Sequence, residues 1–532
     1  MTNHVGDRTI RRRGEEAGTP AKVLVICFDG MEATLVERLA RRGSLPTFAG
    51  LAKRGTTYRL DSCLDTIPDA VWLELSTGRS AGYLGCHWHP RQVFAGEARQ
   101  RALEFGDIEA RDFWQHASEA GRRVAVIDVP QTAPSPGLNG IQLHEWGTHE
   151  RRGSARTDPP ELAADLLGRH GAHPLAHDQG TLSRCDDHPD TPEGFAQLRD
   201  ALLAGAEKRM HLFLDLLDSE SWDLFVGTFT EAHCAGHQMW HLHDARSPWH
   251  DPDAPLELRT AVERVYAELD AGLAAVLERA GPEADILVLL SHGMDLNRGG
   301  WQLLPELLVR LGYGSGHGVT SAARSRLPDP VKRVLKAIIP GPTRTRLQAA
   351  AGSLPEPLES PRTRALGVMN GFCDAIRLNV AGRDPYGSVE PGAEYDELCT
   401  EIAAELDELE NPLIDGPAVK EVVRTVAVYG KDVHPNLPDL VIRWNPDQPV
   451  IETLQSSRAG VVSRPVRVRP VPRSGDHSAE SRLWAFGPSF SAGETVEGGR
   501  TVDLAPTVLE LLDVARPAQL DGRALTSPAL HA

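Results

Sequence analysis

Short runs of consecutive apolar residues recur along the chain and alternate with longer segments of helical periodicity. Runs of this kind are typical of strands buried on both faces of a sheet. The predicted strands are 22–28, 122–130, 224–226 and 285–291. The predicted helices between and around them are 33–42, 113–120, 195–217 and 256–279. This alternation predicts an α/β protein with a mostly parallel central sheet and helices on both faces.

A smaller unit is predicted in the second half of the chain. Strand patterns at 372–380 and 438–444 flank a helical pattern at 395–408. Strands and a helix of this size indicate a small α+β insertion. We expect it to comprise residues 371–450 and to form a cap on the main domain. A last helical pattern covers 501–514.

The remaining long segments show little periodicity. Residues 1–20 are polar and contain no apolar stretch, so we expect a disordered tail and no signal peptide. Residues 141–194 are rich in Pro, His and Asp, which predicts an excursion over the surface. Residues 312–364 are basic and rich in Pro and Gly, with one short helix predicted at 329–338, and we expect a mobile insertion there. One large domain is expected over 21–525.

Composition narrows the class of protein. The chain has 532 residues, of which 41% are hydrophobic and 24% charged, values ordinary for a globular protein. A formal charge of -18 argues against binding to a nucleic-acid duplex or to an anionic membrane surface. No run of 18 apolar residues is present, so no membrane span is predicted. The seven cysteines are scattered and form no CxxC, which favours free thiols and a cytoplasmic location.

The densest group of reactive side chains follows the predicted strand at 224–226. It contains His233, His237, His241 and His243. Histidines spaced i, i+4 lie on one face of a helix, where their imidazoles can bind one metal ion. The alternative is a polar helix start whose histidines lie in the core or on the surface. The density of the group favours metal binding.

Three further candidates lie at strand ends or in loops. Asp29 directly follows the first predicted strand, and His292 directly follows the strand at 285–291. Open α/β sheets bind ligands at the carboxyl ends of their strands. His477 lies in a late polar loop. These positions place two candidate ligands at one edge of the sheet.

Thr66 precedes a helix predicted at 68–77, which starts at Pro68 and stops at Gly78. The helix dipole and the free N–H groups place a partial positive charge at a helix N-terminus. This charge favours the alkoxide form of a hydroxyl there and also favours a bound phosphate. The alternative is a simple helix cap.

The order of these residues resembles the alkaline phosphatase superfamily, specifically its type I phosphodiesterase/nucleotide pyrophosphatase branch, over about 22–525. The residues that carry the resemblance are Asp29, Thr66, His233, His237, His292 and His477. The resemblance implies two divalent metal ions, usually zinc with manganese as the alternative, and a metal-bound Thr alkoxide that attacks phosphorus. It implies one ion at Asp29, Thr66 and His292, and the other at His233, His237 and His477.

Three positions depart from the family pattern. His233 stands where the family has Asp, and Ser291 stands where it has another Asp directly before His292. Counting back from the end of the helix, the nucleophile of the family falls at Pro68, two residues after Thr66. We keep Thr66 as the expected nucleophile.

Asp69 and Ser76 are the alternatives to Thr66 as nucleophile. Asp69 is also a candidate for substrate binding, together with Trp240 and Arg298. For Trp240 the alternative is packing against the sheet edge, and for Arg298 it is a solvated side chain.

The expected function is hydrolysis of phosphate esters by a metal-dependent enzyme. The alternatives are a sulfate or phosphonate ester hydrolase or transferase on the same fold, and a member without catalysis that binds a metal or another ligand. The expected substrate is a small anionic or lipid-like phosphoester. The sequence does not indicate the oligomeric state.

Overall fold

The computed structural model describes residues 22–148, 154–176, 189–298, 300, 303–314, 357–414, 416–447, 451–463 and 473–525. Its largest element is a nine-stranded sheet in the order β19-β2-β18-β7-β1-β6-β3-β4-β5. The strands are β1 (Val23–Phe28), β2 (Thr56–Asp61), β3 (Val124–Ile127), β4 (Gly140–His144), β5 (Arg156–Asp158), β6 (Leu224–Phe229), β7 (Asp285–Leu290), β18 (Ser481–Phe486) and β19 (Thr495–Arg500). The five central strands β7, β1, β6, β3 and β4 are parallel. Strand β18 is antiparallel to both of its neighbours, and β5 is antiparallel to β4.

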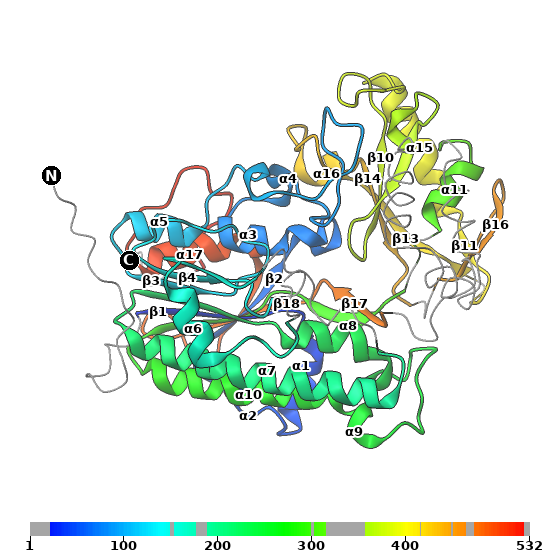
Figure 1. Ribbon diagram of the computed structural model, residues 1–532. Coiled ribbons are helices and arrows are strands. Elements are labelled where there is room, and N and C mark those ends of the chain that lie inside the picture. The colour runs from blue at the N-terminus through cyan, green and yellow to red at the C-terminus, as the bar shows by residue number, and fades with distance from the viewer. Residues whose placement is uncertain are drawn as a thin grey trace, which may run out of the picture.

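Helices cover both faces of this sheet (Figure 1). One face carries α1 (Ala33–Arg41), α2 (Pro46–Arg54), α7 (Pro192–Ser219) and α10 (Ala261–Ala280). The other carries α3 (Val71–Thr77), α5 (Phe113–Glu119) and α17 (Leu504–Leu511). Successive side chains of a strand point to opposite faces, so β1 sends Leu24 and Ile26 into the first core and Val23 and Val25 into the second. The predicted α/β fold class is confirmed.

A smaller unit lies beside the sheet, at the right of Figure 1. One of its two sheets contains β9 (Ala365–Val368), β10 (Asp374–Leu378), β13 (Val419–Arg424) and β14 (Leu440–Trp444). The other contains β11 (Glu410–Asn411), β12 (Gly416–Pro417), β15 (Thr453–Ser456) and β16 (Gly460–Ser463). Helices α11 (Leu304–Arg310) and α15 (Ala393–Asp407) pack on them around a separate apolar core between Leu303 and Val462. We call this unit the cap.

Several predicted elements need correction. The predicted surface excursion is wrong at its start, because β4 is a buried strand of the main sheet and α6 (Leu162–His170) packs against the same core. The five residues of β4 include Gln142 and His144, so they do not form an apolar run. The helix predicted at 68–77 begins as a 3-10 turn, η2 (Pro68–Ala70), before α3. The tail at 1–20, the helix at 329–338 and most of the basic insertion lie outside the described residues.

The cysteines and the hydropathy of the helices bear on two other predictions. Cys27, Cys63, Cys373 and Cys399 are buried free thiols. Cys234 is disulfide-bonded, so the prediction of free thiols throughout is wrong at this position. Among the described helices, none has the length and apolar character needed to cross a membrane.

Candidate metal centre

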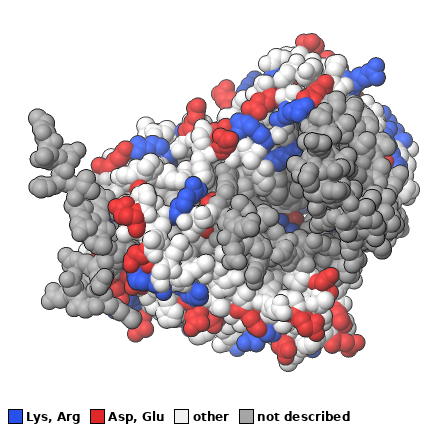
Figure 2. All heavy atoms as spheres, in the orientation of Figure 1, with Lys and Arg blue, Asp and Glu red and all other residues white. Residues whose placement is uncertain are grey.

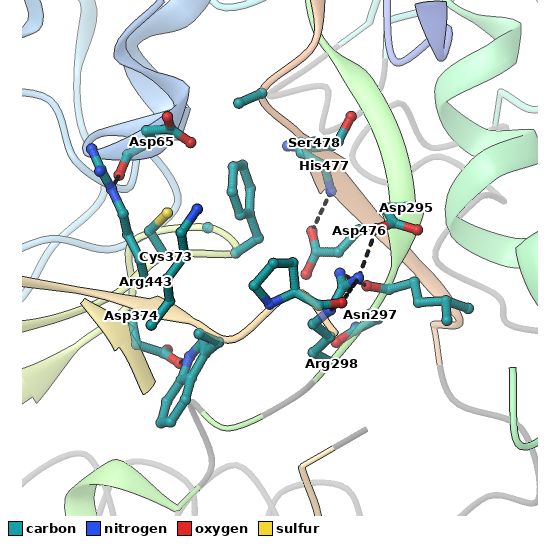
Figure 3. Close-up of a pocket in the computed structure, with 17 residues that line it drawn as sticks. Asp65, Asp295, Asn297, Arg298, Cys373, Asp374, Arg443, Asp476, His477 and Ser478 are labelled. Carbon is teal, nitrogen blue, oxygen red and sulfur yellow. Dashed lines mark hydrogen bonds and ion pairs between the residues drawn. The ribbon is translucent and has the colours of Figure 1, made fainter. Parts of the chain in front are cut away.

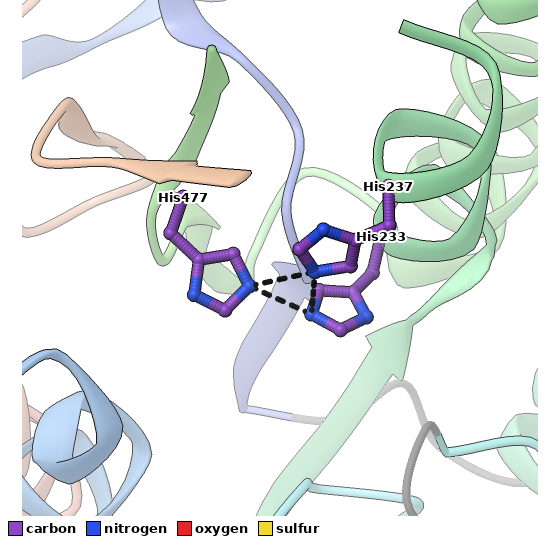
Figure 4. Close-up of side chains that lie close together, drawn as sticks. All are labelled: His233, His237 and His477. Atoms are coloured by element: carbon purple, nitrogen blue, oxygen red, sulfur yellow. Dashed lines mark hydrogen bonds between the residues drawn. The ribbon is translucent and has the colours of Figure 1, made fainter. Parts of the chain in front are cut away.

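Three histidines from two distant segments meet at one point. His233 and His237 lie on α8 (Glu231–His243), which begins directly after β6. His477 lies on β17 (Gly475–Ser478), which pairs antiparallel with β8 (Gly293–Leu296). Figure 4 shows the three rings pointing toward one another from the helix and the strand. The Nε2 atom of His477 lies 2.9 Å from that of His233 and 3.0 Å from that of His237, and the remaining pair is 3.1 Å apart. We call these residues the three-histidine group.

Two groups contact the ring of His237: the carbonyl of Gly475 and the guanidinium of Arg473, whose Nη2 atom lies against Nε2. The Nδ1 atom of His237 lies 2.8 Å from the carbonyl oxygen of Gly475, which can only accept, so Nδ1 is the donor to it. A neutral imidazole has only one N–H, so Nε2 of His237 is an acceptor. A carbonyl that fixes the tautomer in this way is typical of histidines that bind metals. Three nitrogens about 3.3 Å apart are expected around a tetrahedral zinc ion with Zn–N bonds of 2.0–2.1 Å. The three-histidine group therefore fits a divalent ion.

A second group lies at the carboxyl ends of β1 and β7, which are neighbours in the sheet. It consists of Asp29, His292 and again His233, and all three are buried. The Oδ1 atom of Asp29 lies 3.4 Å from Nε2 of His292, and Oδ2 lies 4.0 Å from Nδ1 of His233. The indole N–H of Trp72 donates to Oδ1 of Asp29 at 3.3 Å. We call these residues the Asp29 group.

His292 also has its tautomer fixed by the chain. The Ser291 hydroxyl donates to the carbonyl of Phe28 at 3.1 Å, so its oxygen accepts from Nδ1 of His292, also at 3.1 Å. The Nε2 atom of His292 then carries the lone pair, and it has no hydrogen-bond partner among the described residues. Burial lowers the pKa of His292 to about 3, although the negative charge of Asp69 acts in the opposite direction. The ring is therefore neutral at pH 7, the form that binds metals.

Thr66 is buried directly after the short 3-10 turn Cys63–Asp65. Its Oγ1 atom is 2.6 Å from the hydroxyl of Tyr429, on the cap helix α16 (Thr425–Tyr429), and 3.1 Å from the carbonyl of Cys63. Ser76 lies inside α3 with its hydroxyl 3.4 Å from the carbonyl of Leu73.

A cleft extends from the Asp29 group toward the loops that follow β3 and β4; we call it the metal-side cleft. Its lining includes Asp29, His233, His292 and His477, together with Asp69, His89, Gln131, His144 and Arg473. Asp69 accepts hydrogen bonds from Nδ1 of His89 at 2.8 Å and from Nε2 of Gln131 at 3.1 Å. Pro68 also lines this cleft, whereas Thr66 is not among the residues that line it.

Gln131 and Arg473 are among the polar side chains of this cleft that were missed from the sequence. Gln131 follows the carboxyl end of β3, and its place after a strand was a usable signal. Arg473 comes from a loop, and its Nε atom lies 2.8 Å from Nδ1 of His237. Nothing in the local sequence pattern distinguishes Arg473 from other loop arginines. A guanidinium at this place is suited to phosphate oxygens.

A second cavity, of about 210 Å³, lies between β17 and the cap. Figure 3 shows Asp65, Cys373 and Arg443 on one side of it and Arg298, Asp476 and His477 on the other. We call it the cap-side cavity; His477 lines both it and the metal-side cleft.

The structure separates the two other candidates for substrate binding. Arg298 lines the cap-side cavity, where its Nη2 atom donates to Asp295 and to the carbonyl of Pro446, both at 2.7 Å. Trp240 donates its indole N–H to Asp244 at 3.2 Å and lines a different surface pocket.

The fold and the site define an α/β protein with groups of side chains that could hold metal ions at the carboxyl edge of its sheet. Residues 23–458 match the family model described as type I phosphodiesterase / nucleotide pyrophosphatase. The chain belongs to this family, within the alkaline phosphatase superfamily. It is a hydrolase that acts on phosphoester bonds.

Several solved structures match nearly the whole chain at low sequence identity to it. Phosphonoacetate hydrolase from Sinorhizobium meliloti 1021 is 13% identical, with a TM-score of 0.47 over 95% of this chain and 99% of the other. Murine ectonucleotide pyrophosphatase / phosphodiesterase 5 is 14% identical, with a TM-score of 0.45 over 95% of this chain and 100% of the other. The human protein of that name is 12% identical, with a TM-score of 0.44 over 94% of this chain and 97% of the other. No curated protein sequence matches the chain.

Proposed function

We propose that the protein is a metal-dependent phosphoester hydrolase with two divalent ions, zinc or manganese. The observation that carries the proposal is the convergence of three Nε2 atoms within 3.1 Å of one another. The three-histidine group would hold one ion, and Asp29 and His292 with Thr66 would hold the other. Bound ions would neutralise charge on the phosphoester and lower the pKa of a hydroxyl group or a water molecule.

Thr66 is the proposed nucleophile, and its neighbours support this role. Its hydroxyl donates to the carbonyl of Cys63, so the oxygen accepts from Tyr429. Burial raises the pKa of Tyr429 well above its ordinary value, which keeps the phenol protonated and able to donate. A hydrogen bond donated to an oxygen favours its anionic form. Both bonds position the hydroxyl, and the one from Tyr429 favours its deprotonation.

The remaining polar side chains would bind the substrate. We propose that Asp69, held by His89 and Gln131, contacts the substrate in the metal-side cleft, and that Arg473 contacts phosphate oxygens there. The leaving group would enter the cap-side cavity, where Arg298 lies. Phe372 and Trp444 also line that cavity, so an apolar group would be accepted as well.

A small anionic or lipid-like ester suits this site better than a polymer. The cap-side cavity has a volume of about 210 Å³, which is below the usual range of roughly 300–1,000 Å³ for ligand pockets. Positive and negative side chains are interspersed over the described part of the face in Figure 2. With a formal charge of -18, this argues against a nucleic-acid duplex as the partner.

A cytoplasmic location is also part of the proposal, and the buried free thiols among the described residues support it. The disulfide at Cys234 is the observation against it. Fractionation of the native host cells tests it, and recovery of the protein outside the cytoplasm would reject it.

The test of function is hydrolysis of p-nitrophenyl phosphate and bis(p-nitrophenyl) phosphate before and after chelation. Turnover is expected to disappear with EDTA and to return with Zn²⁺ or Mn²⁺, and His237→Ala is expected to abolish it. The matched control is His211→Ala, which removes an exposed histidine of α7. Full turnover by the metal-free protein would reject the proposal.

A further inference from the structure

We propose that His233 is shared by the two groups of ligands and bridges the two ions through both nitrogens of its ring. This rests on the proposed function, since both groups must hold an ion. The ring would bind one ion through Nε2, with His237 and His477, and the other through Nδ1, with Asp29 and His292. Each nitrogen of an imidazole has one in-plane lone pair once both protons are absent, so the ring can serve two ions.

The orientation of the ring carries the inference. The Nε2 atom of His233 lies 2.9 Å from Nε2 of His477 and 3.1 Å from Nε2 of His237. The Nδ1 atom faces the other group and lies 4.0 Å from Oδ2 of Asp29. The rings of His233 and His292 are nearly perpendicular, with centroids 5.9 Å apart. The two groups of ligands therefore face different nitrogens of one ring.

Backbone packing holds the ring between the two groups. Gly30 follows Asp29 and has a positive φ of 66°. A Cβ atom at Gly30 would lie 2.8 Å from Cα of His233 and 3.0 Å from its Cδ2. Only a residue without a side chain lets the end of β1 pack so closely on His233. On its other side the ring meets His477, with ring centroids 5.0 Å apart.

The charges of the ligands give a reason for a bridge. In the Asp29 group the only carboxylate is Asp29, because Ser291 is neutral and its hydroxyl is bonded to Phe28 and His292. A bridging ring has lost its last N–H proton to solvent and carries one negative charge. The anionic ring and Asp29 together would bring two negative charges to the two dications, leaving net positive charge for an anionic ester. The bridging ring supplies the charge that Ser291 does not.

The simpler arrangement keeps a proton on Nδ1 of His233, directed at Asp29, and holds one ion in the three-histidine group. The separation of 4.0 Å between Nδ1 and Oδ2 is too long for that hydrogen bond. This arrangement is nevertheless a definite outcome of the test below.

Copper(II) distinguishes the two arrangements because an imidazolate bridge couples the spins of two copper ions antiferromagnetically. The full-length protein is stripped with chelator, titrated with Cu²⁺, and analysed by ICP mass spectrometry and low-temperature EPR. The bridge predicts two coppers per chain and an integrated signal far below two spins. His292→Ala is expected to hold one copper with the full signal of one spin, and His233→Ala is expected to weaken both sites.

Two results would overturn the bridge. One is two coppers that give the full signal of two spins. The other is a wild-type protein that binds a single copper, together with a His292→Ala variant that still binds it. That result supports one ion in the three-histidine group. A second copper that persists in His292→Ala binds elsewhere and also counts against the bridge. The wild-type spin count decides the question even where a variant fails to fold.

Turnover of the zinc-loaded protein, measured in parallel, separates this inference from the proposed function. Coupled copper spins in a protein that leaves all esters intact would reject the function and keep the bridge. Ester turnover with uncoupled spins would reject the bridge alone.

Discussion

At the scale of single residues, the histidine tautomers depend on one hydrogen bond each. The carbonyl of Gly475 fixes His237, and the Ser291 hydroxyl fixes His292. In both cases Nδ1 is the donor and Nε2 faces the other ligands. Ser291 stands where the family resemblance implies an Asp, and here it serves to orient its neighbour. A departure from a family pattern therefore need not mean a lost site.

Removing the hydroxyl of Thr66 tests the proposed nucleophile. Thr66→Ala is expected to lower kcat at least about 1,000-fold, because no oxygen remains at that position to attack phosphorus. Thr66→Ser keeps the oxygen and is expected to retain a measurable rate. Steady-state kinetics with bis(p-nitrophenyl) phosphate measures both, and unchanged thermal unfolding shows that the variants fold. Wild-type turnover in Thr66→Ala, with none in Asp69→Asn, would move the nucleophile to Asp69.

Arg209 is a fully buried residue that supports the start of α8. Its guanidinium contacts Asp128 at 2.7 Å and Glu231 at 2.8 Å, and Glu231 comes two residues before His233. Burial alone would raise the pKa of Glu231, but the charges of Arg209 and His173 lower it to about 2. The start of α8 is therefore held by a charge network that depends on Arg209.

Arg209→Met is expected to destabilise the protein by about 3–5 kcal/mol, because two carboxylates would remain buried without their cation. Urea unfolding measures the change. The control is Arg279→Met, which removes a surface ion pair with Asp218 and is expected to cost less than about 1 kcal/mol. Equal losses in the two variants would contradict a structural role for the buried network.

At the scale of elements, the end of β1 and the first turn of α8 form a close contact at the metal centre. Gly30→Ala is expected to displace His233, since the new Cβ would lie 2.8 Å from its Cα atom. The matched control is Gly43→Ala, at a similar φ of 79° but with open space around its Cβ position. Both substitutions place an alanine at a positive φ, which costs a similar backbone strain. The difference between the two variants therefore reports the steric clash with His233.

Thermal unfolding and metal analysis measure that difference. The Gly43→Ala variant is expected to keep its full metal content, and Gly30→Ala is expected to lose ions from both groups of ligands. Equal metal content in the two variants would show that the contact with Gly30 does not position His233.

The sequence predicted those elements that carry a continuous pattern. Strand β1 is buried along its whole length and β7 is buried from Ile286 onward, and these residues form apolar runs. Strands β2 and β18 were not predicted, because β2 alternates between buried and exposed positions and β18 contains the buried Arg482. The predictions of strands were therefore reliable for the middle of the sheet and failed toward its edges.

The candidate ligands were predictable for a related reason. Asp29 and His292 follow buried strands, and the carboxyl ends of parallel strands meet at one edge. The contact of His477 with α8 depends on the β8–β17 pairing, which no local pattern indicates; only the family order placed it. Trp240 is close in sequence to His237, yet its indole is bonded to Asp244. Proximity in sequence does not fix the direction of a side chain.

At the scale of the whole molecule, buried titratable groups act on stability in opposite directions. Burial lowers the pKa of His241 to about 4, and the nearby His250 acts in the same direction. Burial raises the pKa of Asp112 to about 7, opposed by a hydrogen bond from Ser76. The unfolded chain has ordinary values near 6.5 for His and 3.9 for Asp. His241 therefore makes the protein less stable as pH falls from about 6.5 to 4. Asp112 makes it less stable as pH rises from about 4 to 7.

Because His241 and Asp112 act in opposite directions, the free energy of unfolding is expected to depend only weakly on pH between 4 and 7. Replacing either residue alone is expected to reveal the pH dependence that the other one causes. Relative to wild type, His241→Asn is expected to gain stability as pH falls through that range, and Asp112→Asn as pH rises through it. Each change is on the order of 3–4 kcal/mol at full span, since one pKa unit corresponds to about 1.4 kcal/mol. Urea unfolding at pH 4.5, 6 and 7.5 in EDTA measures both without contributions from metal binding. Parallel curves for wild type and both variants would mean that neither burial shift is present in the folded protein.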